Sequence, residues 1–174
     1  MSWLNLNLST TLAALVVWGF LMAFLFNVLL KVAAPKKENL ILVSSFIMFL
    51  SYFISDDFFN LFALPEIYIT WFVYDLVTLC LIFGFAYILK EKIPSSIKYI
   101  IVGLIINSLL FLAMHIDIVI NRNQERWLLW DIYTVGVNLV DFIMIIALIF
   151  NKDYLGIIRF SKFITSLIRK KALN

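Results

Sequence analysis

Five apolar runs, each near the length of a membrane-spanning helix, constrain this chain more than any other feature. A helix needs roughly 20 mostly apolar residues to cross the hydrocarbon layer of a bilayer. The runs cover residues 11–30, 40–55, 68–89, 97–120 and 127–150, and the second is the shortest. The connections contain all three prolines, Pro35, Pro65 and Pro94, so no run is broken by a helix breaker. We therefore predict an all-α membrane protein with a bundle of five transmembrane helices.

Composition supports the same class. The chain is 64% hydrophobic and only 14% charged over 174 residues, whereas a soluble domain is about half apolar and about a quarter charged. A soluble core of this size could not hide so much apolar surface. We predict a membrane domain over residues 1–150 and a tail over residues 151–174. A single cysteine, Cys80, and a single histidine, His115, exclude an internal disulfide and a multi-histidine metal site, so we expect no metal and no cofactor.

Basic residues indicate how the helices are oriented. Cytoplasmic connections of membrane proteins carry an excess of Lys and Arg. With the N-terminus outside, twelve of the fourteen basic residues lie in the cytoplasm, and only Arg122 and Arg126 lie outside. We predict an N-out, C-in topology, and the basic residues beside membrane segments do not indicate nucleic-acid binding. The bias toward Ile, Lys, Asn and Phe and the short connections favour a bacterial cytoplasmic (inner) membrane.

The tail has the pattern of a basic amphipathic helix. Apolar residues such as Ile157, Phe160 and Leu167 fall on one side of a helical wheel. The basic residues predicted to bind anionic lipid headgroups are Arg159, Lys162, Arg169, Lys170 and Lys171. Such a helix favours the headgroup plane of an anionic leaflet. Two alternatives remain open: a dock for one specific lipid or protein, or a segment that only completes the bundle.

A polar stripe crosses the fifth run. Its members are Asp131, Thr134, Asn138 and Asp141, which share one helix face at about 100° per residue. Two carboxylates inside a membrane-length helix are costly unless something shields them, and intramembrane ionisable residues mark ion and proton paths.

Other runs supply candidate partners for this stripe. The third run contains Asp75 and Thr78, and the segment 71–78 weakly resembles 127–134, with Trp, Asp and Thr at matching places. The alternative to an internal repeat is convergence. His115 lies near the outer end of the fourth run. The predicted pathway therefore comprises Asp75, Thr78, His115, Asp131, Thr134, Asn138 and Asp141.

Three functional hypotheses follow. The first is a homo-oligomeric cation or proton pathway, either a channel, a transporter or a membrane-depolarising effector, in which Asp131→Asn and Asp141→Asn abolish flux. The second is a non-catalytic interaction protein, for immunity, assembly or anchoring, whose polar residues only pack helices. The third is a lipid-directed enzyme using Asp75, His115 and Asp131, but no catalytic motif supports it, so we predict that the protein is not an enzyme.

Overall fold

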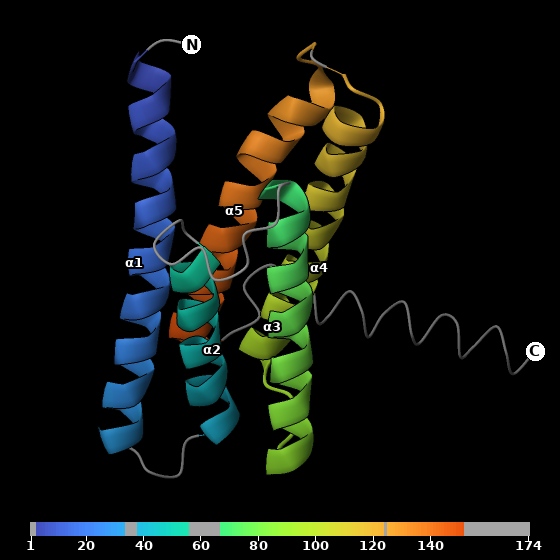
Figure 1. The fold of residues 1–174 in the computed structure, drawn as a ribbon. Coiled ribbons are helices and arrows are strands. Elements are labelled where there is room, and N and C mark those ends of the chain that lie inside the picture. The colour runs from blue at the N-terminus through green and yellow to red at the C-terminus, as the bar shows by residue number, and fades with distance from the viewer. Residues whose placement is uncertain (1–2, 34–37, 56–66, 124, 152–174) are drawn as a thin grey trace, which may run out of the picture.

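The structure is a computed structural model that describes residues 3–33, 38–55, 67–123 and 125–151, with side chains from Thr11 onward. These residues form five α-helices and one π-helical turn and contain no strand (Figure 1). The elements are α1 (Trp3–Ala33), α2 (Asn39–Ser55), α3 (Ile67–Leu89), α4 (Ser95–His115), η1 (Ile116–Ile120) and α5 (Leu128–Phe150). The all-helical prediction is confirmed for this part of the chain.

Successive helices run antiparallel and close into a ring. Each helix packs on the next one in the chain, and α5 packs back on α1. We call the end that holds the start of α1 and the α4–α5 connection the N-terminal end of the bundle, and the opposite end the C-terminal end (Figure 1).

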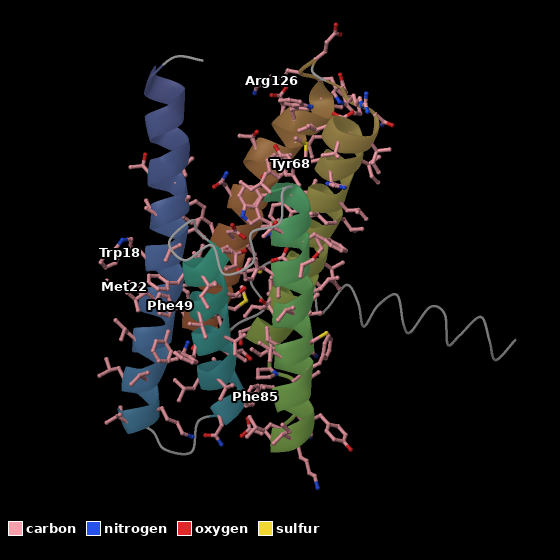
Figure 2. The ribbon with its side chains drawn as sticks, viewed as in Figure 1. Trp18, Met22, Phe49, Tyr68, Phe85 and Arg126 are labelled. Atoms are coloured by element: carbon pink, nitrogen blue, oxygen red, sulfur yellow. The ribbon has the colours of Figure 1, made fainter. Side chains whose placement is uncertain are left out.

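Four helices are long and apolar enough to cross a membrane. They are α1 over Thr11–Ala33, α3, α4 with η1 over Ser95–Ile120, and α5. Helix α2 has 17 residues and is apolar but shorter. Trp18 and Met22 point away from the bundle and expose apolar surface of α1 (Figure 2). These features are those of a helical membrane bundle, while the fifth span and the N-out orientation stay predictions. The predicted tail helix lies outside the described residues.

The apolar core fills the C-terminal half of the ring. Its fully buried side chains include Met48 on α2, Ile82 on α3, Leu104 on α4 and Met144 on α5. A glycine lets α4 and α5 approach here, because a Cβ on Gly103 would lie 2.7 Å from Met144 Cγ. Small residues commonly permit such close packing between membrane helices.

Polar contacts tie the helix ends together at the C-terminal end. The Glu91 carboxylate, between α3 and α4, accepts hydrogen bonds from the backbone N–H of Asn39 at 3.2 Å and of Leu40 at 2.9 Å. These amides belong to the first turn of α2, which has no helical partner for them. Asn27 of α1 donates to the Leu148 carbonyl of α5 at 3.1 Å, and Asn151 accepts from the Ser96 N–H.

Among the described residues, the N-terminal half of the ring is more open than the C-terminal half. Helix α2 ends at Ser55, and α5 leans away from α1 toward the N-terminal end (Figure 1). Close contact between α1 and α5 occurs near Ile145, which packs on Gly19, and near Leu148. The face of α5 that α1 covers at Ile145 is therefore less covered at residues one to three turns nearer the start of α5.

Candidate functional site

Asp141 occupies the middle of a hydrogen-bonded group that joins three helices. Its Oδ1 atom accepts a hydrogen bond from the Tyr52 hydroxyl of α2 at 2.6 Å and another from Asn107 Nδ2 of α4 at 2.8 Å. Asp141 is only 4% exposed, and Asn107 is fully buried. The carboxyl group therefore lies inside the ring, at the level where α2 approaches its end.

A second buried carboxyl group lies beside the first. Asp75 of α3 is 6% exposed and is near enough to Asp141 for the two carboxyls to repel each other when both are charged. Ser108 of α4 also interacts with the Asp75 carboxyl. We call Tyr52, Asp75, Asn107, Ser108 and Asp141 the carboxyl cluster. Four helices of one chain build it.

The carboxyl cluster has no basic member. The described groups that interact with Asp75 and Asp141 are Tyr52, Asn107, Ser108, Tyr133 and the other carboxyl, with no lysine, arginine or histidine among them. An uncompensated ion in a protein interior costs several kcal/mol, and two like charges cost more. The two carboxyls therefore need a proton, a bound cation or water to be stable here.

A hydroxyl pair and the apolar core lie on the C-terminal side of the cluster. Thr78 lies one turn beyond Asp75. Its hydroxyl forms hydrogen bonds with the Ser51 hydroxyl of α2, at 2.6 Å, and with the Tyr74 carbonyl of its own helix, at 2.8 Å. Met48, Ile82, Leu104 and Met144 then fill the ring. In this conformation, apolar side chains separate the carboxyl cluster from the C-terminal end.

Aromatic rings cover the cluster toward the N-terminal end, on the side of α3, α4 and α5. Trp71 packs on Phe111 at 5.5 Å between ring centroids, Phe111 on Tyr133 at 6.0 Å, and Tyr133 on Tyr68 at 5.7 Å. Figure 2 shows Tyr68 near the start of α3. We call these four residues the aromatic layer. It lies one to two helical turns from Asp75 and Asp141.

The rest of the polar stripe on α5 is open to the surroundings. The Asp131 side chain is 59% exposed and forms an ion pair with Arg126, which lies at the N-terminal end (Figure 2). Thr134 donates to the Trp130 carbonyl and Asn138 donates to the Thr134 carbonyl, both at 2.7 Å. Each of these side chains therefore forms its hydrogen bond within α5. The stripe shares its face with Ile145, and exposure falls along it toward Asp141. Polar groups therefore lead from the N-terminal end to the carboxyl cluster.

The predicted histidine lies apart from the cluster, at the junction of α4 and η1. His115 is half-buried at the end of α4, two turns beyond Ser108. The adjacent π-helical turn contains Asp117, which was not among the predicted pathway residues and is buried. Its Oδ2 atom accepts hydrogen bonds from Trp127 Nε1 at 2.9 Å and Trp130 Nε1 at 3.0 Å. Asp117 thus fastens the start of α5 to the end of α4.

The structure brings some predicted residues together and separates others. Asp75 and Asp141 share the carboxyl cluster and Thr78 adjoins it, whereas Asp131, Thr134 and Asn138 lie along the open part of α5. Tyr52 was missed from sequence, although it continues a run of polar residues on α2 that includes Ser44, Ser45 and Ser51. The five predicted lipid-binding residues of the tail lie outside the described residues.

Comparison with known proteins adds no functional label. No protein-family model, no curated protein and no solved structure matches the chain. Any functional conclusion therefore depends on the geometry and chemistry of the carboxyl cluster. Among the described residues, no group of three or more His, Cys, Asp and Glu side chains could hold a metal ion.

Proposed function

We propose that the protein binds protons or small cations at Asp75 and Asp141 and moves them across a membrane. The observation that carries this proposal is the pair of buried carboxyls, Asp75 on α3 and Asp141 on α5, with no basic partner among the described residues. A bound positive species stabilises a pair of this kind, and the pair can exchange that species if a path reaches it.

The open stripe on α5 supports one such path. Asp131, Thr134 and Asn138 offer oxygen atoms at successive depths between the N-terminal end and Asp141. Under the N-out topology, this path starts outside the cell, at the exposed Asp131 carboxylate. The apolar core on the C-terminal side of the carboxyl cluster favours a gated ion pathway, since hydrophobic constrictions close ion paths by excluding water.

The same proposal covers the topology, the location and the oligomeric state of the protein. The chain is proposed to cross a bacterial inner membrane five times with an N-out, C-in topology. It is also proposed to form a homo-oligomer, because five helices enclose little volume for a permanent pore. The basic tail helix, residues 151–174, is proposed to lie on anionic lipid of the cytoplasmic leaflet. Opening of the apolar core in response to a signal would give a channel, and alternating exposure of Asp141 would give a transporter.

Flux through liposomes tests the proposal. Purified protein is reconstituted with an internal pH dye or a K⁺ gradient, and wild type is compared with Asp141→Asn. Glu125→Gln is the matched control, because Glu125 is an exposed carboxylate outside the carboxyl cluster. We expect flux in wild type and in the control, and loss of flux in Asp141→Asn. Equal flux in wild type and in a folded Asp141→Asn protein would overturn the proposal.

One observation favours a second candidate, the non-catalytic interaction protein. Asp141 Oδ1 already accepts two short interhelical hydrogen bonds, and this is what a packing network requires. In that case Asp75→Asn and Asp141→Asn keep function, while deletion of residues 156–174 removes binding to a membrane or cytoplasmic partner. Affinity purification of both variants and of the deletion mutant separates the two candidates.

A further inference from the structure

The carboxyl cluster contains three buried oxygen atoms that accept no hydrogen bond from the described residues. Asp75 Oδ2, Asn107 Oδ1 and Ser108 Oγ are each buried without a hydrogen-bond partner among the described residues. Nearly all buried polar atoms in proteins have a partner, so such atoms need an explanation. The Ser108 hydroxyl has its own hydrogen and can turn it toward the Asp75 carboxyl, so the groups that still lack a positive partner are the Asp75 carboxylate and Asn107 Oδ1.

A metal cation satisfies several oxygen atoms at once. Hard cations select carboxylate, carbonyl and hydroxyl oxygen, and the unpaired atoms here supply one of each kind. They belong to α3 and to two adjacent residues of α4, and Ser108 interacts directly with the Asp75 carboxyl. The set contains no sulfur or imidazole ligand that would favour a softer transition metal.

The carboxylate charge in the carboxyl cluster favours a monovalent cation over a divalent one. Asp141 Oδ1 accepts hydrogen bonds from the Tyr52 hydroxyl and the Asn107 amide, whereas Asp75 Oδ2 accepts none, so the less compensated carboxylate charge is the one on Asp75. A single positive charge balances it, whereas a divalent ion would require both carboxylates as ligands. We propose that Asp75, Asn107 Oδ1 and Ser108 Oγ bind one alkali-metal cation beside Asp141. This rests on the proposed function, since it names the ion class taken by the same site.

Equilibrium binding tests this inference without any need for transport. Protein in detergent and choline chloride is titrated with NaCl, LiCl or KCl at constant ionic strength, and tryptophan fluorescence and melting temperature are recorded. Trp71 is a suitable reporter, because it lies one turn from Asp75 in the aromatic layer. We expect a saturable response to at least one of these ions. Its apparent Kd should rise at least tenfold in Asp75→Asn, rise a few-fold in Ser108→Ala and be unchanged in Glu125→Gln.

The outcomes distinguish this inference from the proposed function. A response no larger than that to choline, or one unchanged in both Asp75→Asn and Ser108→Ala, overturns the alkali-cation site and leaves water or protons in the cluster. Ser108→Ala keeps both carboxyls, so it serves if Asp75→Asn does not fold. Proton flux without alkali-ion binding would remove the cation site alone. Alkali-ion binding without flux would remove the transport proposal alone.

Discussion

The Tyr52 hydroxyl donates a 2.6 Å hydrogen bond to Asp141 Oδ1, which joins α2 to α5 across 89 residues of sequence. The Tyr52 ring also packs on Phe20 of α1, with 4.5 Å between ring centroids. One side chain thus links three helices at the level where α2 nears its end. The short helix is held in the ring by a polar contact as well as by apolar packing.

Replacing Tyr52 with phenylalanine should lower the free energy of unfolding by about 1–2 kcal/mol, because one interhelical hydrogen bond to a carboxyl is lost while the ring is kept. Tyr87→Phe is the control, since Tyr87 is 85% exposed on α3 and should change stability little. Chemical or thermal unfolding in detergent measures both. A double-mutant cycle with Asp141→Asn should show coupling between the two sites, and additive effects would contradict a direct bond.

Much of the fold could be predicted from hydrophobic length alone. Each of the five predicted runs corresponds to a helix, because twenty apolar residues without proline have few other ways to satisfy their backbone. The hydrophobic pattern is least decisive for α2, because this helix has only 17 residues. Hydropathy does not state whether a helix of this length crosses the bilayer, so the five-span number and the orientation stay predictions.

The candidate site was only partly predictable, because a helical wheel gives the angle of a residue but not its depth against neighbouring helices. Asp131 and Asp141 share a face of α5, yet one is 59% exposed in an ion pair and the other is 4% exposed in the carboxyl cluster. The difference arises because α1 and α2 cover that face only in part. The contact between Tyr52 and Asp141 depends on the register of α2 against α5, which no local pattern encodes.

Asp117→Asn should loosen the joint between α4 and α5 at the N-terminal end. Asp117 Oδ2 accepts from the indoles of both Trp127 and Trp130, and a neutral amide cannot serve both donors as well. We expect a red shift of tryptophan emission and a lower melting temperature. Asp131→Asn is the control, because an exposed ion pair contributes less than about 1 kcal/mol. A larger loss of stability in Asp131→Asn than in Asp117→Asn would contradict this assignment.

Glu91→Ala should fray the start of α2. The carboxylate accepts from the N–H groups of Asn39 and Leu40 and from Asn39 Nδ2, as a capping side chain does, and it lies at the positive end of the helix dipole. Loss of such a cap costs about 0.5–2 kcal/mol. Hydrogen–deuterium exchange should be faster at the Leu40 amide in Glu91→Ala and unchanged in Glu38→Ala, whose exposed side chain lies next to the same helix. Equal exchange in the two variants would argue against a cap.

Gly103 and Gly84 provide a matched pair that tests the contact between α4 and α5. A Cβ on Gly103 would lie 2.7 Å from Met144 Cγ and 3.2 Å from Val140 Cγ1, whereas a Cβ on Gly84 would meet nothing within 4 Å. Both replacements by alanine gain the same helix propensity, up to about 1 kcal/mol, so their difference isolates the packing effect.

Gly103→Ala should therefore be less stable than Gly84→Ala by about 1–3 kcal/mol, which is the usual cost of forcing extra atoms into a filled core. Met144 is fully buried, so its side chain has little room to move away. Thermal unfolding of both variants beside wild type gives the difference. In a Met144→Ala background, Gly103→Ala should cost less than it does in wild type, because the smaller side chain makes room for the new methyl group. Equal melting temperatures for the two single variants would show that α4 and α5 pack less closely at this level.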